Sequence, residues 1–183
     1  MRGFTLIEIL VVVAVSVVVM SSFIAYNSVS RAQVALSVEQ AKIAQVILRA
    51  KSLTISSYTE EQGPLGPFRC GYGVSIDYAG RSYSLNRYDV SDNAICDAIY
   101  KGSAGFENVT AVQRETYFLD SNLKFSFPAS VVGDELEDVL FIAPEPKTFI
   151  QVGGSLIGGT TAKIYLETKA ASPIRATVSV NSV

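Results

Sequence analysis

An unbroken apolar run near the N-terminus is the feature that most constrains what this chain can fold into. Between Phe4 and Ile24 the only strongly polar residue is Glu8, and the other polar side chains are hydroxyls. As an α-helix this segment would be about 31 Å long, which matches the hydrocarbon core of a bilayer. We therefore expect a membrane-spanning helix whose hydroxyls bond back to its own carbonyls.

The residues before the apolar run do not form an ordinary secretory signal. Such a signal places its small-residue cleavage site after the apolar segment, whereas Arg2 and Gly3 both precede it. Cleavage between Gly3 and Phe4 would keep the run in the mature protein and would create a charged amine. That amine is a partner for Glu8, because an unpaired carboxylate in a bilayer costs about 2.5 kcal/mol or more. The alternative is an uncleaved anchor with Glu8 at the interface.

The stretch "RGFTLIEILVVVAV" resembles the leader and mature N-terminus of the type IV pilin and type II secretion pseudopilin superfamily. The resemblance implies that a prepilin peptidase cleaves after Gly3 and N-methylates Phe4. It also implies that Glu8 pairs with the Phe4 amine of a neighbouring subunit during filament assembly. Many pilins carry Gly within the apolar run and Pro near its end, but this chain has neither between Phe4 and Leu53. A continuous helix is therefore expected.

The helix is predicted to continue as an amphipathic segment over residues 26–58. Its apolar face consists of Leu36, Ile43, Val46, Ile47, Ala50 and Leu53. Spacings of three, four and seven residues predict packing on a sheet of the same chain. Leu48 falls outside this face, and a separate coiled coil is the less favoured alternative. The helix should end near Ser56 to Tyr58, before the "EEQGPLGPF" boundary.

Residues 59–183 are predicted to form a β-rich head. The segment "YGVSIDYAGRSYSL" alternates apolar and polar residues around a turn and predicts a hairpin, and later segments such as "LKFSFP", "DVLFIA", "AKIYLE" and "IRATVSV" have the same pattern. We expect one or two small antiparallel sheets. The predicted fold class is α+β, with a long N-terminal helix packed on a small antiparallel β-sheet head, as in pilins.

A weaker resemblance concerns the head. The "GYGVSID" hairpin, with "KIYLET" and "ATVSV" near the end, is similar to H-type pseudopilins and to related minor pilins that are often linked to DNA uptake. Arg175 is the lone basic residue of the final segment, and the chain's net charge is -2 without a basic stripe. We therefore expect no nucleic acid partner.

Cys70 and Cys96 are the only cysteines. With Arg2 on the cytoplasmic side, the membrane segment would place both outside the cytoplasm, where disulfides persist. A Cys70–Cys96 disulfide is the preferred interpretation, and two buried free thiols are the alternative.

The composition argues against catalysis. The chain has no histidine, which removes the usual general base and the commonest metal ligand. "GDELEDV" lacks the oxygen spacing of a calcium loop and predicts a solvated turn, while "QVGGSLIGGTT" predicts a flexible connection between strands. We expect no enzyme, no cofactor and no metal.

The sequence thus predicts four segments: a leader (1–3), a transmembrane or filament-core helix (4–25), an amphipathic helix (26–58) and the head (59–183). The expected function is a pilin or minor pilin, a structural subunit of an extracellular type IV pilus-like filament. The alternatives are a minor pseudopilin of a type II secretion system and a tip binding module.

Expected partners are a prepilin peptidase, other pilins or further copies in a helical filament, and the membrane before assembly. The chain should cross the cytoplasmic membrane once, N-terminus in and head outside, and later form an extracellular or periplasmic filament.

Overall fold

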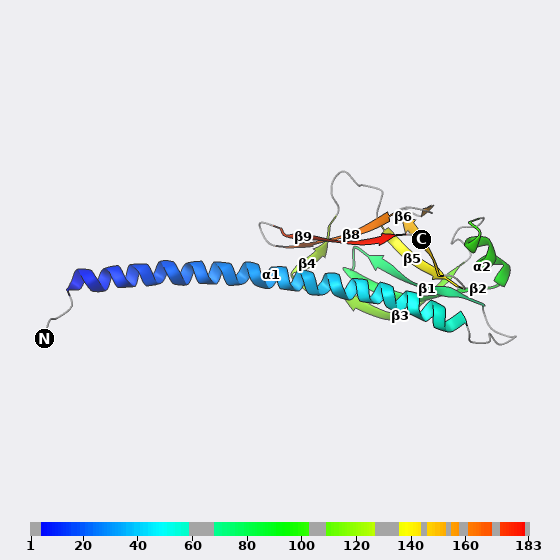
Figure 1. Ribbon diagram of the computed structural model, residues 1–183, viewed down its shortest axis with the longest axis horizontal. Coiled ribbons are helices and arrows are strands. Elements are labelled where there is room, and N and C mark those ends of the chain that lie inside the picture. The colour runs from blue at the N-terminus through cyan, green and yellow to red at the C-terminus, as the bar shows by residue number, and fades with distance from the viewer. Residues whose placement is uncertain are drawn as a thin grey trace.

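One long helix and two antiparallel sheets make up the protein (Figure 1). The computed structural model describes residues 5–58, 68–102, 109–126, 136–143, 146–152, 155–157, 161–169 and 173–181. Helix α1 (Leu6–Tyr58) has 53 residues. Its N-terminal part extends away from the head, and its C-terminal part lies against the sheets. This arrangement confirms the predicted α+β fold class.

Helix α1 runs without interruption across the predicted membrane-spanning and amphipathic segments. The hydroxyls of Ser16, Ser21 and Ser22 donate to the carbonyls of the residues four positions earlier, at 2.8–3.0 Å, as the sequence predicted. No Gly or Pro interrupts the segment, so every interior backbone donor keeps its helical partner. The helix ends at Tyr58, within the predicted range.

The larger sheet has six strands in the order β3-β2-β1-β5-β6-β7, and each neighbouring pair is antiparallel. The strands are β1 (Phe68–Asp77), β2 (Ser82–Val90), β3 (Thr110–Phe118), β5 (Leu136–Ile142), β6 (Lys147–Val152) and β7 (Ser155–Ile157). The predicted hairpin is confirmed, with Val74 opposite Leu85 and Ile76 opposite Tyr83.

The smaller sheet contains β4 (Leu123–Phe125), β8 (Thr161–Thr168) and β9 (Arg175–Asn181) in the order β4-β8-β9. The carboxylate of Glu167 links its strands: Lys124 lies 2.7 Å away, Ser126 donates at 2.8 Å and Arg175 lies 3.1 Å away. The hydrogen bond from Lys124 leads the interactions that lower the pKa of Glu167 to about 2. This network therefore stabilises the fold above about pH 4.5, and its contribution is lost as the pH falls toward 2.

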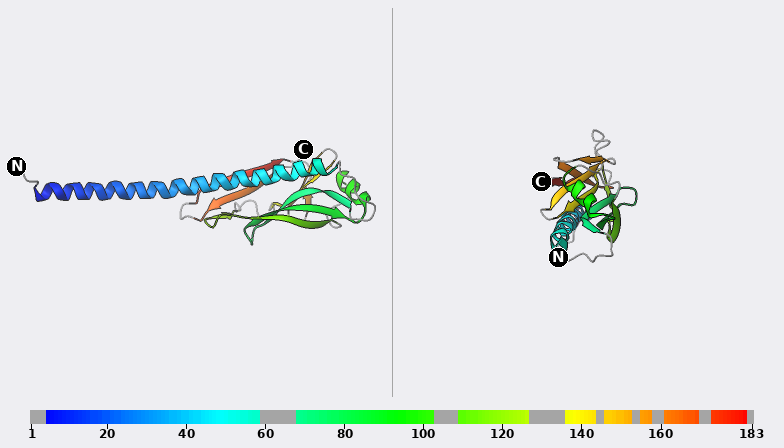
Figure 2. Two further views of the ribbon diagram at one scale, coloured as in Figure 1. Left: turned by 90° about the horizontal axis from the view of Figure 1, so that it is seen from below. Right: turned by 90° about the vertical axis from the view of Figure 1, so that its right-hand side faces the viewer.

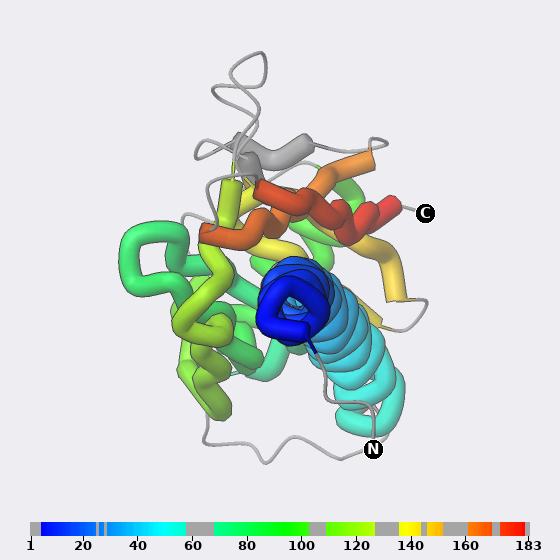
Figure 3. Tube along the Cα trace, turned by 90° about the vertical axis from the view of Figure 1, so that its left-hand side faces the viewer, coloured from blue at the N-terminus to red at the C-terminus, as the bar shows by residue number. Residues whose placement is uncertain are grey.

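Helix α1 packs against both sheets through the predicted apolar face (Figure 2). Ile43 is 1% exposed and Ala50 is completely buried, whereas Leu48 is 66% exposed, as its position off that face predicted. Thr54 adds a polar contact, because its hydroxyl accepts a hydrogen bond from the Tyr72 amide at 3.0 Å. Seen along α1, both sheets lie around one side of the helix and leave its other side uncovered (Figure 3).

Two parts of the head were not predicted. Helix α2 (Asn93–Tyr100) begins after Asp92, whose carboxylate accepts from the Ala94 amide at 2.9 Å, and it buries Ile99. The "QVGGSLIGGTT" segment is not simply a flexible connection, because Val152 pairs with Ser155 where β6 and β7 form an antiparallel hairpin. The Asp N-cap and the Gly-Gly dipeptide between strands are the sequence signals for these elements.

We predict that Ile43→Ala and Leu48→Ala affect stability very differently although both shorten a side chain of α1. Ile43→Ala should lower the free energy of unfolding by about 2–4 kcal/mol, because it opens a cavity between the helix and the sheets. Leu48→Ala should change it by about 0.5 kcal/mol or less, because that side chain faces outward. Urea unfolding of the detergent-solubilised chain measures the free energy of unfolding of both variants. Equal losses of this free energy would contradict the assignment of the two faces.

Candidate processing and assembly site

The start of α1 holds the residues that the sequence singled out for processing and assembly. Gly3 and Phe4 lie outside the described residues, so cleavage after Gly3 and methylation of Phe4 stay predictions. Glu8 lies in the first turn of α1, at the end of the molecule farthest from the head.

Glu8 supplies the carboxylate half of a capping box with Thr5, whose hydroxyl donates to Glu8 Oε2 at 3.5 Å rather than accepting from the Glu8 amide. The Thr5 amide donates to Glu8 Oε2 at 3.4 Å, and the Thr5 carbonyl accepts from the Glu8 amide at 3.0 Å. Thr-x-x-Glu is the sequence pattern of this motif, and the sequence analysis did not use it. In the single chain, the Glu8 carboxylate therefore caps its own helix, and the positive end of the helix dipole also favours a negative charge there.

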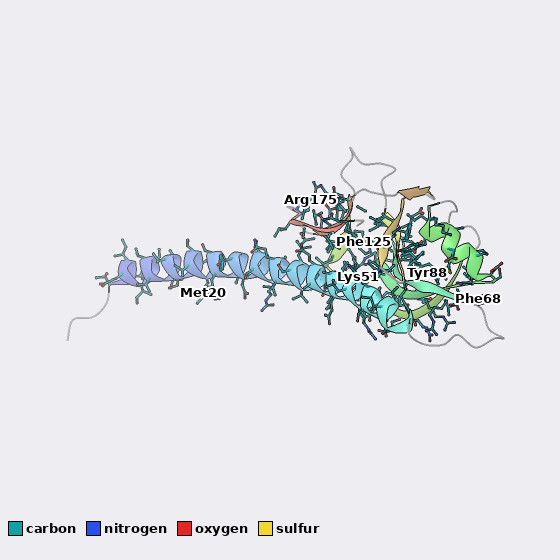
Figure 4. All side chains as sticks on the ribbon, turned by 45° about the vertical axis from the view of Figure 1, so that its right-hand side comes forward. Met20, Lys51, Phe68, Tyr88, Phe125 and Arg175 are labelled. Atoms are coloured by element: carbon teal, nitrogen blue, oxygen red, sulfur yellow. A yellow bond between two sulfur atoms is a disulfide. The ribbon has the colours of Figure 1, made fainter. Side chains whose placement is uncertain are left out.

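The apolar run that follows Glu8 extends away from the head. Its large side chains are exposed from Leu6 through Ile24, and α1 is long and apolar enough to cross a membrane. Figure 4 shows Met20 on this uncovered part of the helix, whereas Phe68 lies at the far end of the head. The run is consistent with membrane anchoring before assembly.

A second set of exposed apolar side chains lies on the C-terminal part of α1. We call it the outer stripe, and it consists of Val34, Val38, Ala41, Leu48 and Ile55. Spacings of three, four and seven residues put these side chains on one face, which lies opposite the face buried against the sheets. Gln45 and Ser52, both exposed, lie between members of the stripe and interrupt it with uncharged polar groups. Sequence reasoning treated Leu48 as an imperfection of the buried face and missed the stripe to which it belongs.

Polar contacts fix the helix relative to both sheets. Arg49 makes a bidentate ion pair with Glu115 of β3, at 2.7 and 2.8 Å, and the Tyr117 hydroxyl also bonds Glu115. Hydrogen bonds from Tyr117 and Arg49 lower the pKa of Glu115. Gln40 donates to the carbonyl of Thr177 in β9 at 2.8 Å. The outer stripe therefore has a defined orientation relative to the head.

Cys70 and Cys96 form a disulfide between β1 and α2, with their Cα atoms 5.4 Å apart. Cys70 lies at a register shift between Arg69 and Gly71, where the extra residue lets its side chain face α2. Gly71 has no room for a Cβ atom, which would overlap the carbonyl of Phe141. The disulfide holds α2 at the end of the head away from the apolar run.

The "GDELEDV" segment is not entirely a solvated turn. Asp138 lies in β5 and accepts a hydrogen bond from the Tyr88 hydroxyl at 2.7 Å, and burial is the main cause that raises its pKa. Asp134 and Glu135 lie outside the described residues. Within the described ranges, no group of three or more potential protein ligands could hold a metal ion.

Comparison with known proteins identifies one motif. The prokaryotic N-terminal methylation motif matches residues 1–24. No curated protein and no solved structure matches the chain. The motif and the helix-plus-sheet fold support the type IV pilin and pseudopilin superfamily that the sequence resembles, and thus a pilin-like or pseudopilin substrate of a prepilin peptidase.

We predict that Gly3→Arg blocks processing, because a long charged side chain would occupy the place of the small residue at the cleavage site. The variant should accumulate as an uncleaved, membrane-retained precursor, whereas the mature wild-type chain should begin with methylated Phe4. Mass spectrometry of the N-terminal peptide measures cleavage and methylation in each chain. Processing of the variant at the wild-type rate would contradict cleavage after Gly3.

Proposed function

We propose that this chain, which carries the N-terminal methylation motif of prepilins, is a non-catalytic structural subunit of an extracellular type IV pilus-like filament. One observation carries the proposal: both halves of α1 carry apolar side chains that the chain itself does not cover. The apolar run is exposed from Leu6 to Ile24, and the outer stripe follows it from Val34 to Ile55.

Uncovered apolar surface of this extent needs a partner, because soluble monomers rarely expose contiguous apolar patches larger than a few hundred Å². A bilayer can cover the apolar run before assembly. The outer stripe lies on the part of the helix beside the head, where only another protein surface would cover it in water. Apolar helices of neighbouring subunits would cover both surfaces in a filament.

The orientation of the helix favours an open polymer. Bonds from Arg49 and Gln40 fix α1 to both sheets, so the outer stripe faces away from the head in every copy. Head-to-tail contacts between different surfaces of identical subunits produce helical filaments rather than closed rings. Helices would then gather at the centre of the filament with heads outside.

Glu8 would change partner during assembly. In the single chain its carboxylate accepts from the Thr5 amide at 3.4 Å, a long hydrogen bond. A charged amine from the N-terminus of a neighbouring chain is a stronger partner in an apolar environment. An incoming subunit is therefore favoured in the register at which Glu8 meets that amine.

Two related roles use the same surfaces. A minor pseudopilin of a type II secretion system would have the same helix and processing motif. A tip binding module would also have both, but it would be a low-abundance subunit of the filament. Immunogold labelling along purified filaments supports an abundant pilin, whereas labelling only at filament ends supports a tip component. An enzymatic role is not part of the proposal, because the chain has no histidine to act as a general base.

We predict that Glu8→Ala and Glu8→Gln both insert, undergo cleavage and fail to enter filaments. Gln is also suited to the third helical position of a capping box, so Glu8→Gln retains the cap but lacks the charge. Sedimentation of sheared filaments, followed by immunoblotting, measures assembly. Normal assembly of Glu8→Gln would show that capping alone matters and would overturn the charge-pairing role.

We also predict that Leu48→Lys reduces filament yield at least about tenfold, because it places a charge in the outer stripe where burial would be required. Gln33→Lys is the matched control, since it adds the same charge at an exposed position outside the stripe. The midpoint of urea unfolding should be the same in both variants as in the wild-type chain. Equal filament yields from the two variants would contradict a role for the stripe in assembly.

A further inference from the structure

A groove of about 620 Å³ lies where α1 leaves the head. We call it the neck groove. Phe23, Ile24 and Arg31 of α1 line one side, and Asn122 and Lys169, from the turns beside β4 and β8, line the other. Figure 1 shows that β4 and the adjoining end of β8 form the end of the head nearest the apolar run.

The groove lies at the level of a membrane surface. The apolar run ends at Ile24, and at 1.5 Å per residue Arg31 lies about 10 Å farther along the helix. A bilayer's polar headgroup layer extends about 5–8 Å beyond the hydrocarbon core on each side. If the run from Leu6 to Ile24 fills the core, Phe23 and Ile24 lie beside the headgroup-proximal part of the acyl chains. The backbone of Arg31 then lies just beyond the headgroup layer, and its long side chain, which tilts toward the N-terminus of the helix, reaches back to the headgroups.

The side chains around the groove are suited to an anionic amphiphile. Arg31 and Lys169 supply two positive charges, Asn122 supplies an amide, and no acidic residue lines the groove within the described part of the chain. Phe23 and Ile24 are each 69% exposed and add an apolar wall. A phosphate beside the two cations, with an acyl chain along the apolar wall, satisfies both halves of the groove.

The head side of the groove is held in place by hydrogen bonds. Lys169 Nζ donates to the Ser121 carbonyl at 2.8 Å, and its backbone amide donates to the Asn122 carbonyl at 2.8 Å. Arg81 donates to the Asp120 carbonyl at 3.0 Å, which fixes the same turn to the β1–β2 hairpin. An ammonium group has three donors, so Lys169 can bond a phosphate oxygen without giving up its bond to Ser121.

We propose that the neck groove binds the headgroup of one anionic phospholipid while the chain is in the membrane. This inference rests on the proposed function only in taking the apolar run to be inserted in a bilayer. The bound lipid would hold the membrane-facing end of the head against the bilayer surface. Extraction of a subunit into a filament would then require release of that lipid.

The test uses the full chain in mild detergent with an equimolar mixture of phosphatidylglycerol and phosphatidylcholine. Native mass spectrometry measures which lipid stays bound. Wild-type protein should retain phosphatidylglycerol preferentially, and each basic side chain should contribute about fivefold to the preference. The double variant Arg31→Gln, Lys169→Gln should lose the preference. Lys101→Gln, Arg114→Gln is the matched control, because it removes two exposed cations elsewhere and should keep the preference.

A photoreactive phosphatidylglycerol with its crosslinker near the headgroup locates the contact. Wild-type crosslinks should map to tryptic peptides next to Arg31 and Lys169, and excess phosphatidylglycerol, but not free glycerol phosphate, should compete. An unchanged preference in the groove variant overturns the proposal. An equal loss in both double variants, or full competition by glycerol phosphate, also overturns it.

The outcome is separable from that of the proposed function. Lipid retention is measured on unassembled chain, whereas filament yield is measured by sedimentation. Filaments from a chain without lipid preference would overturn the lipid site alone. Lipid preference in a chain that never polymerises would count against the filament role alone.

Discussion

The rest of the structure depends on the packing of one face of α1 against both sheets. Ile43, Val46 and Ala50 are buried in a single apolar core that also contains side chains from the larger and the smaller sheet. The helix contacts strands of both sheets and so helps to join them into one head. The same packing fixes the apolar run and the outer stripe in direction, because both continue from the buried helix.

Three surfaces of one helix have different requirements. The inner face of the C-terminal part needs the sheets, the apolar run needs a bilayer or other helices, and the outer stripe needs protein. The neck groove lies where the first two meet, so its side chains change from apolar to basic within two turns of helix, from Ile24 to Arg31. Under the proposed function, the kind of side chain in each part of α1 matches the surroundings that this part would meet: the bilayer, the sheets of the head or a neighbouring subunit.

Local sequence patterns predicted most of the fold. The apolar run, the inner face of α1 and the β1–β2 hairpin each have one clear periodicity, and the structure confirms all three. Helix α2 was missed because eight residues carry little periodic signal, and Asp92 was the only strong boundary residue. The neck groove was not predictable, because Arg31 and Lys169 come together only when β8 folds back beside the helix. The Thr-x-x-Glu pattern of the cap at Glu8 is present in the sequence, but the sequence analysis assigned the carboxylate only to pairing with an amine.

The uninterrupted course of α1 has a mechanical consequence. A helix of 53 residues without Gly or Pro is a rod about 80 Å long with no hinge to absorb displacement. Tension applied to the head therefore travels along the backbone hydrogen bonds to the first turn. Within the chain, that tension loads the contacts between helix and sheets in shear, where Arg49 and Gln40 bond the strands on either side. Resistance to pulling is thus shared along the rod rather than concentrated at a joint.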